Sequence, residues 1–390
     1  MNLVPSKTFV LLLLSLVVME GCSSPSASRD PAGAPGSVAA ANKVPPSRDL
    51  LPGMPPVTDP ADIYSADRPN QLSDVVRNIP PRVYVPNTES NSVDVIDPAT
   101  FKVVKHYKVG KQPQHVTPSW DLKTLWVLND KSSTLTRIDP MTATLHETIR
   151  VLDPYNMYYT PDGKYAIVVA EQRERLEFYE AATMKMAKEV WVPCKGVDHM
   201  DFTANGRYLI ASCEFGGAVI KFDVANQKLM QRLPVSPKGM PQDVKTSPDG
   251  TVFYVADMMA DGVHEIDPES FHEIGFIPTG KGAHGLYVSR DSKVMYVSNR
   301  GEGTISLVDL ASRKVAKKWA IPGGGSPDMG GVSADGKVLW LSGRYNSEVY
   351  AIDTADGHLL AKIPVGHGPH GLCIYPQPGR YSLGHTGVFR

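Results

Sequence analysis

The sequence predicts an all-β fold, a single seven-bladed β-propeller of four-stranded antiparallel blades, and three observations support this prediction. The first is a repeat, because an acidic residue that opens a turn returns at intervals of 41 to 44 residues. This residue occupies positions Asp97, Asp139, Glu180, Asp223, Asp267, Asp309 and Asp353. Units of this length, built from short strands with turns between them, are typical of propeller blades.

The second observation is the composition of each unit, which is clearest between Pro241 and Gly280. Four short runs rich in β-branched and aromatic residues alternate there with turns such as Pro-Asp-Gly at 248–250 and Asp-Pro-Glu-Ser at 267–270. Runs of this kind, bounded by Gly, Pro, Asp and Ser, are typical of strands and hairpins. A lone sheet of four strands would leave an apolar face uncovered, so each unit needs neighbours of the same kind.

The third observation concerns the two ends of the repeat region. Residues Val83–Asn87 match the second strand of a unit, so the first unit lacks its own first strand. The matching first strand is Pro369–Pro376, the last apolar run in the chain. We therefore expect the C-terminal strand to complete the first blade, which leaves no blade open and few unpaired sheet edges.

The N-terminus resembles an export signal. Lys7 precedes the apolar run Phe9–Met19, which is too short to span a membrane as a helix and fits a signal peptide. Gly21 and Cys22 then resemble a bacterial lipobox, which implies a lipid on Cys22; ordinary secretion is the alternative. We expect an exported lipoprotein, periplasmic or on the cell surface, held at the membrane by its lipid anchor.

Composition divides the rest of the chain and excludes one class of partner. The expected parts are a signal peptide with lipobox at 1–22, a Pro- and Ser-rich tether and N-terminal segment at 23–79, the propeller at 80–376 and a tail at 377–390. With 40 basic and 41 acidic residues, the chain has no electrostatic footprint for nucleic acid. Cys194 and Cys213 are expected on one face of the fold. They could form a disulfide there or remain as two free thiols.

A candidate site lies near the start of the innermost strands. One repeated position there is assigned to His115, Asn156, His199, Asp243, His284, Asp328 and His370, and the second strands end in Asp130, Glu171, Glu214, Arg300 and Arg344. Imidazoles and carboxylates are ligands for transition metals, and arginines from adjacent blades suit a carboxylate or a phosphate. The predicted ligand-binding residues are His284, Asp328, His370, His115, Arg300 and Arg344, with His284, Asp328 and His370 as the metal set.

The alternative for this ring is structural, since such side chains can tie a loop to the neighbouring strand. A ring of seven is also too wide for all members to reach one ion, because metal–nitrogen bonds are about 2.0–2.1 Å long. The solvated mouth of the channel is the expected position of the ring. Three further histidines, His358, His367 and His385, are expected to be isolated surface residues.

The repeat at Ala283–Lys314, with Tyr-Val-Ser-Asn at 296–299, and the segment Val85–Lys102 resemble the YVTN family of β-propeller repeats. This resemblance spans about residues 82–376 and implies the propeller fold. The wider superfamily includes the d-type haem domain of dissimilatory nitrite reductase and, more distantly, NirF-type proteins of d-type haem synthesis. The resemblance implies a d-type haem as one candidate cofactor, whereas the side chains of the ring allow a divalent metal; the sequence leaves the cofactor open.

Three functions stay open from the sequence, and they differ in whether the chain is an enzyme. The first is a binding or assembly protein whose funnel face holds a small acidic ligand or a protein partner. The second is a NirF-like oxidoreductase or tetrapyrrole-handling factor, and the third is a metal-dependent lyase or lactonase. Because one propeller fold hosts many functions, the geometry of the site has to decide among them.

Overall fold

The structure is a computed structural model that describes residues 49–235, 238–385 and 388–390. The predicted signal peptide, Cys22 and much of the predicted tether lie outside these residues. The chain divides into two units, Met1–Asn42 and Lys43–Arg390, and all the described residues belong to the second. None of the helices in the described part of the chain is long and apolar enough to cross a membrane.

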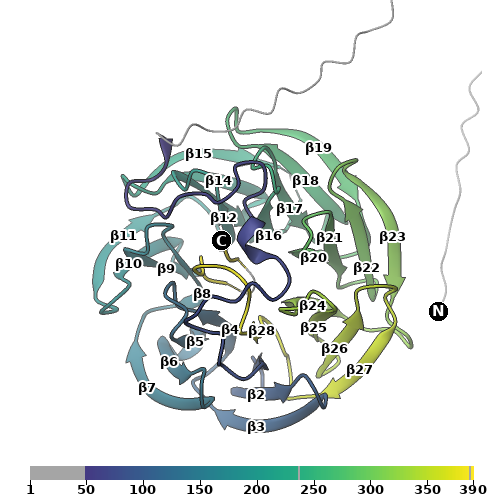
Figure 1. Cartoon of the computed structure of the whole chain (residues 1–390). Coiled ribbons are helices and arrows are strands. Elements are labelled where there is room, and N and C mark those ends of the chain that lie inside the picture. Colours follow the sequence, from purple (N-terminus) through teal and green to yellow (C-terminus); the bar gives the residue numbers. More distant parts are fainter. Residues whose placement is uncertain (1–48, 236–237, 386–387) are drawn as a thin grey trace, which may run out of the picture. The chain divides into compact units, whose positions relative to one another are not determined.

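Seven four-stranded antiparallel sheets stand around a central channel, which confirms the predicted fold (Figure 1). We number the blades in chain order and give the strands of each from the channel outwards. Blade 1 consists of β28 (Cys373–Tyr375), β1 (Arg82–Asn87), β2 (Ser92–Asp97) and β3 (Lys102–Lys108), and blade 2 of β4 (Pro113–Pro118), β5 (Leu125–Asn129), β6 (Thr134–Asp139) and β7 (Thr144–Arg150). Blade 3 consists of β8 (Pro154–Tyr159), β9 (Tyr165–Ala170), β10 (Arg175–Glu180) and β11 (Met186–Trp191), and blade 4 of β12 (Val197–Phe202), β13 (Tyr208–Cys213), β14 (Ala218–Asp223) and β15 (Lys228–Pro234).

The remaining three blades follow the same plan. Blades 5 to 7 are β16 (Pro241–Thr246), β17 (Phe253–Asp257), β18 (Gly262–Asp267), β19 (His272–Pro278); β20 (Ala283–Val288), β21 (Val294–Asn299), β22 (Thr304–Asp309), β23 (Lys314–Ala320); and β24 (Pro327–Val332), β25 (Val338–Gly343), β26 (Glu348–Asp353), β27 (Leu359–Pro364). The described helices are short 3-10 turns, η2 (Ser65–Asp67), η3 (Asp130–Ser132) and η4 (Glu214–Gly216).

Burial falls from the channel outwards in each blade, which explains the composition of the strands. Every residue of the innermost strand β4 is buried, whereas most of the outermost strand β7 is exposed or half-buried. Neighbouring blades share apolar clusters, such as the one that joins Tyr254 of blade 5 to Leu286 and Val297 of blade 6. Each such side chain contributes about 1.5–3 kcal/mol when it is fully buried.

The repeated acidic residue has a local structural role. The Asp139 and Asp267 carboxylates accept hydrogen bonds from the backbone N–H groups of Met141 and Glu269, at 2.8 and 2.9 Å. This is the Asx-turn arrangement, in which an aspartate side chain satisfies a backbone donor two residues further on. The turn between the third and fourth strands therefore reuses the same residue type in successive blades.

The ring closes as predicted, with the C-terminal strand in blade 1. β28 pairs antiparallel with β1, with Cys373 opposite Tyr84, and a separate bridge joins Pro369 to Asn87. Segments more than 280 residues apart in the sequence thus form one sheet. The innermost edge of β1 is covered, which removes an open edge from the propeller.

The two faces of the ring differ, and we name them by their connections. The turn face carries the turns between the first and second strands, and the loop face is the one where the innermost strands begin. Residues 49–81 cross the turn face, where the N–H groups of Leu51 and Ile63 donate to the carbonyls of Asn205 and Pro248, each at 2.8 Å. Apart from the 3-10 turn η2, this segment is an irregular strip that lies on the propeller (Figure 1).

The C-terminal tail enters the central channel from the turn face. It follows β28 and runs beside β8, where the Tyr159 N–H donates to Leu383 O at 2.9 Å and the His385 N–H donates to Met157 O at 3.1 Å. Arg390 forms a buried ion pair with Asp201 at 2.8 Å. The tail therefore plugs one end of the channel.

Candidate functional site

The polar residues at the start of the innermost strands form two tiers. The prediction that they share one repeated position is therefore wrong, because it combined residues from two neighbouring strand positions. In every blade the innermost strand begins opposite the end of the second strand, as Pro113 does opposite Asn129 and Ala283 opposite Asn299, and the register then shifts. Counted from that pair, the second residues are Gln114, Tyr155, Asp198, Gln242, His284, Asp328 and His370, and the third residues are His115, Asn156, His199, Asp243, Gly285, Met329 and Gly371. We call these sets the upper tier and the lower tier.

The predicted solvated position of the histidines is also wrong. His115 and His199 are fully buried, and His284 and His370 are at most 3% exposed. The C-terminal tail contributes to this burial, since the ring of His385 lies against those of His115 and His199. Burial lowers the pKa of all four imidazoles well below the usual value, so these side chains are neutral at physiological pH.

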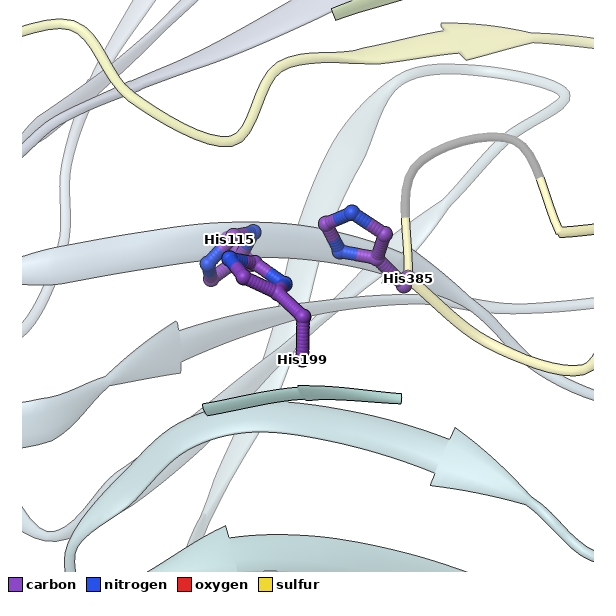
Figure 2. A group of neighbouring side chains, drawn as sticks. All are labelled: His115, His199 and His385. Carbon is purple, nitrogen blue, oxygen red and sulfur yellow. The ribbon is translucent and has the colours of Figure 1, made fainter. Parts of the chain in front are cut away.

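The lower tier receives a fifth histidine, His385, which the sequence had placed on the surface. It is fully buried, and its burial lowers its pKa as well. Ligand atoms of His115, His199 and His385 all lie within 4.8 Å of one another (Figure 2). The ring centroid of His385 lies 4.6 Å from that of His199 and 5.1 Å from that of His115. His358 and His367 are exposed, as predicted.

Asn156 holds two of these imidazoles in one tautomer. Its Oδ1 accepts the Met157 N–H at 2.8 Å, which turns its Nδ2 towards the histidines. Nδ2 donates to Nδ1 of His199 at 3.0 Å and to Nδ1 of His385 at 3.1 Å. An amide nitrogen has no lone pair to accept with, so both Nδ1 atoms are acceptors and each neutral ring carries its proton on Nε2.

Carboxyl groups face the Nε2 atoms of the same two rings. His199 Nε2 lies 3.2 Å from Asp198 Oδ1, and His385 Nε2 lies 3.9 Å from Asp243 Oδ1. Burial raises the pKa of Asp198 well above its usual value and that of Asp243 to about 6. His115 differs, because neither of its ring nitrogens has a hydrogen-bond partner among the described residues.

The predicted metal set, His284, Asp328 and His370, lies in the upper tier on consecutive blades. Asp328 Oδ1 is 3.2 Å from His284 Nδ1 and accepts a hydrogen bond from Arg300 Nη1 at 3.0 Å. His370 stands apart from this pair, with its ring centroid 6.1 Å from that of His284 and 4.9 Å from that of His115. Among the described residues, the three imidazoles whose ligand atoms lie within 4.8 Å of one another are instead His115, His199 and His385.

The two predicted arginines differ in their partners. Arg300 pairs with Asp328 and lies over the ring of the exposed Tyr345, 5.5 Å from its centroid. Arg344 is half-buried, and its Nη1 donates to two neutral oxygens, Thr88 Oγ1 at 3.3 Å and Gly368 O at 3.4 Å. Within the described residues Arg344 has no carboxylate partner.

Acidic residues line the other side of the loop face. Burial, followed by the charges of Glu214 and Asp130, raises the pKa of Glu171 to about 8. Burial also raises the pKa of Glu214. The loop face therefore carries Arg300 and Arg344 on one side and acidic residues on the other, with His199 beneath the acidic side.

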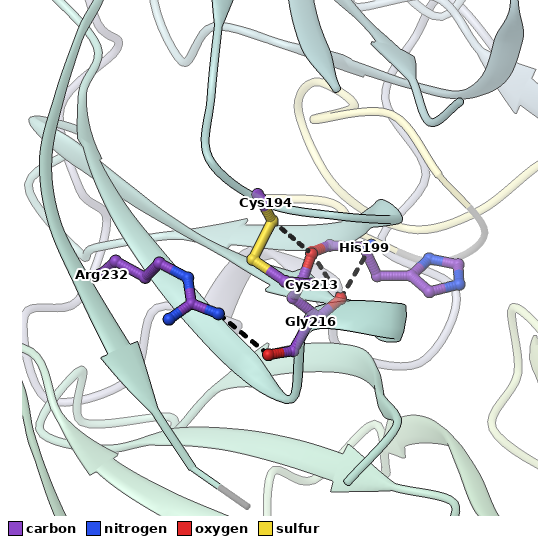
Figure 3. The surroundings of a disulfide bond; sticks show 6 residues. Cys194, His199, Cys213, Gly216 and Arg232 are labelled. Carbon is purple, nitrogen blue, oxygen red and sulfur yellow. Dashed lines mark hydrogen bonds between the residues drawn. A yellow bond between two sulfur atoms is a disulfide. The ribbon is translucent and has the colours of Figure 1, made fainter. Parts of the chain in front are cut away.

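Cys194 and Cys213 form a disulfide, which decides between the two alternatives left by the sequence (Figure 3). The bond joins the loop before β12 to the end of β13. Beside it, Ser212 Oγ accepts the His199 N–H at 3.1 Å and donates to His199 O at 3.2 Å. The disulfide thus braces the strand pair that positions His199. Cys373 is a free, buried thiol.

A separate groove lies away from the histidines. It encloses about 430 Å³ between blades 2 and 3. Its lining includes Trp120 and Trp126, with the ion pair between Arg137 and Glu147 at 2.7 Å. No histidine lines this groove, so it is separate from the candidate site in the channel.

Comparison with known proteins adds a family and a fold. The sequence matches the model of the family described as YNCE-like beta-propeller over residues 64–379. No curated protein matches it.

Solved structures of low sequence identity share the fold. Hydrazine synthase of Kuenenia stuttgartiensis is 18% identical with a TM-score of 0.59, over 70% of this chain and 92% of that one. A functionally unknown protein from Desulfotomaculum acetoxidans is 16% identical with a TM-score of 0.63, over 75% and 98%. The dihydro-heme d1 dehydrogenase NirN, in complex with DHE, is 15% identical with a TM-score of 0.60, over 78% and 76%.

Proposed function

This chain belongs to the YNCE-like β-propeller family, and from that premise we propose that it is an exported, lipid-anchored binding protein whose loop face holds a small anionic ligand. One observation carries the proposal: Arg344, a half-buried guanidinium at the mouth of the channel, has only neutral oxygen partners among the described residues. A guanidinium recognises carboxylate or phosphate through paired hydrogen bonds. An anion at this position would supply the missing counter-charge.

The surroundings of Arg344 favour an anion over a cation. The charge of Arg344 is, after burial, the largest influence that lowers the pKa of His370, so the two groups share one side of the mouth. His370 is neutral and both of its ring nitrogens are unpartnered among the described residues, so it can donate one hydrogen bond to a ligand. The neighbouring Arg300 is already neutralised by Asp328.

Export is supported by two independent features. The N-terminal sequence has the length and composition of a signal peptide that ends in Gly21-Cys22. The propeller contains a disulfide between Cys194 and Cys213, and structural disulfides persist in oxidising compartments such as the periplasm. A lipid on Cys22 would hold the propeller at a membrane through the following Pro- and Ser-rich residues.

A second candidate is a tetrapyrrole-handling role. A tetrapyrrole carries carboxylates that suit Arg344 and a central metal that suits an imidazole. The observation that favours it is His370, whose unpartnered ring lies on the same side of the mouth as Arg344. The likeness to NirN concerns the fold alone and adds no weight to this candidate.

The test uses the protein purified from its own host, with Arg344→Ala as the variant. Small molecules released by denaturation are identified by mass spectrometry, and the absorption spectrum of the intact protein is recorded. We expect an organic anion that is enriched in the wild type and depleted at least about tenfold in Arg344→Ala, since a lost charged hydrogen bond costs about 1.5–3 kcal/mol. The matched control is Arg137→Ala in the groove between blades 2 and 3, which should retain the anion.

Each outcome of this test has a clear meaning. A visible absorption band that is lost with Arg344 would select the tetrapyrrole. The same anion content in the wild type and in Arg344→Ala, or no enriched anion in either, would rule out a ligand held by this arginine.

A further inference from the structure

We propose that His115, His199 and His385 form a buried site for a divalent transition-metal ion, of which Zn²⁺ and Cu²⁺ suit three imidazoles best. This site lies in the lower tier and uses none of the residues that hold the proposed anionic ligand. The proposal does not rest on the proposed function, but the two sites adjoin, since the ring centroid of His370 lies 4.9 Å from that of His115. Its ligands come from three separate parts of the chain: β4, β12 and the C-terminal tail (Figure 2).

The spacing of the three side chains is close to that of a metal site. Their ligand atoms all lie within 4.8 Å of one another. Zinc–nitrogen bonds of about 2.0–2.1 Å place the nitrogens of a tetrahedral site about 3.4 Å apart. Rotations of the imidazoles that shorten their separations by about 1–1.5 Å would therefore close the site around an ion.

His115 is the strongest sign of a missing partner. Its side chain is fully buried, and neither Nδ1 nor Nε2 has a hydrogen-bond partner among the described residues. A buried polar group without a partner costs about 1–3 kcal/mol, so such groups need an explanation, and a bound ion is one of the usual ones. Gly371 leaves the space for this ring, since a Cβ there would lie 1.9 Å from His115 Nδ1.

The other two imidazoles already point their lone pairs at a common place. Nδ1 of His199 and Nδ1 of His385 both converge on Nδ2 of Asn156, at 3.0 and 3.1 Å. The amide carries only a partial positive charge there. A metal ion that displaces this amide group would take both lone pairs.

Carboxyl groups lie near the second ring nitrogens of these two imidazoles. Metal-binding histidines usually donate their second ring N–H to a carboxylate, which fixes the tautomer. Here the carboxyl groups are only close by: His199 Nε2 lies 3.2 Å from Asp198 without a hydrogen bond, and Asp243 lies 3.9 Å from His385 Nε2, which is too far for one. Both rings are therefore arranged to bind through Nδ1 while a carboxyl group faces Nε2.

Such an ion would join the tail to the ring. His385 belongs to the tail, whereas His115 and His199 belong to blades 2 and 4. Binding that occurs only in the folded state raises stability by mass action. We therefore expect metal to raise the melting temperature of the full chain by several degrees, and chelation to lower it.

The direct test is titration of the metal-stripped full chain with Zn²⁺ by calorimetry and with Co²⁺ by absorption. We expect one ion per chain and intense visible Co²⁺ bands of a tetrahedral site. His115→Gln and His385→Ala should each weaken Zn²⁺ binding at least about 100-fold, since even outer-shell changes cost 10–100-fold. The matched control is His367→Ala, an exposed histidine that should leave binding unchanged.

A measurement on the wild type guards against variants that fail to fold. The electron paramagnetic resonance spectrum of the Cu²⁺-loaded protein should show hyperfine splitting from coordinated imidazole nitrogens. A wild type that takes up no stoichiometric metal, either on incubation or on refolding with it, would overturn the proposal. Equal Zn²⁺ affinity in His115→Gln and the wild type, or equal loss in His367→Ala, would overturn it as well.

Discussion

The two arcs of the channel wall differ at the same strand positions, which places polar side chains at two depths of the channel. In the lower tier, blades 2 to 5 present His115, Asn156, His199 and Asp243, whereas blades 6, 7 and 1 present Gly285, Met329 and Gly371. In the upper tier, blades 6, 7 and 1 instead carry His284, Asp328 and His370. The predicted ligand residue is thus the third residue of the innermost strand in blades 2 to 5 and the second residue in blades 6, 7 and 1.

This shift of one residue places the polar side chains of the two arcs at different depths in the channel. On the first arc the polar side chains reach the C-terminal tail and surround His385. On the second arc they lie nearer the loop face, where Arg300 pairs with Asp328 and Arg344 retains only neutral partners. A register shift after the first pair of each innermost strand permits both placements without a change in the fold, since bulges re-aim side chains.

The largest expected effect comes from removing the strand that closes the ring. Deletion of residues 369–390 should abolish cooperative thermal unfolding, because it exposes the edge of β1 and removes the tail from the channel. Deletion of residues 377–390 is the matched control, since it keeps β28 and removes only the tail. It should fold with a lower melting temperature. A cooperative transition in the longer deletion would refute closure by β28.

The ion pair that holds the tail should come next. Arg390→Met leaves Asp201 buried without its partner, and such a loss costs about 3–5 kcal/mol. Denaturant unfolding measures this difference. The exposed Arg380→Met is the control and should change stability by less than about 0.5 kcal/mol. A similar small change for Arg390→Met would mean that the tail does not depend on this pair.

The acidic arc predicts a pH dependence. Burial raises the pKa of Glu171 to about 8, so between the unfolded value of 4.5 and that value the folded state holds a proton that the unfolded state releases. Stability therefore falls as pH rises through this window. Glu171→Gln should raise stability at pH 8 by on the order of 2 kcal/mol and change it little at pH 4. Equal effects at both pH values would argue against a raised pKa.

The smallest effect on the fold is expected at the anchor. Cys22→Ser should move the protein from the membrane fraction to the soluble fraction, because the proposed anchor is the lipid on that sulfur. The melting temperature of the propeller should stay the same, since the family match begins only at residue 64. A variant that stays in the membrane fraction would count against a lipoprotein.

The fold could be predicted from the sequence because its signals are local and repeated. The acidic residue that opens each turn satisfies backbone donors within its own turn, as Asp139 and Asp267 do. Closure could be predicted as well, since Val83–Asn87 matches a second strand and needs the first strand at Pro369–Pro376. These features depend on hydrogen bonding and burial patterns that a single repeat displays.

The site could be predicted only in part, because it depends on register and on the tail. Residue spacing did not show the register shift that follows Pro113 or Ala283. The prediction therefore placed the residues of both tiers in one ring. His385 and its contact with Asn156 join residues 229 positions apart. No periodic pattern marks the tail, and only its buried position identifies His385 as part of the cluster.

The most direct test of two sites in one channel compares Zn²⁺ stoichiometry in two double variants. His115→Gln with His385→Ala removes lower-tier ligands, and His284→Ala with His370→Ala removes upper-tier histidines. We expect calorimetry to give a stoichiometry of one Zn²⁺ per chain in the wild type and in the upper-tier variant, and no Zn²⁺ binding in the lower-tier variant. Loss of Zn²⁺ from the upper-tier variant, with binding retained in a folded lower-tier variant, would contradict it.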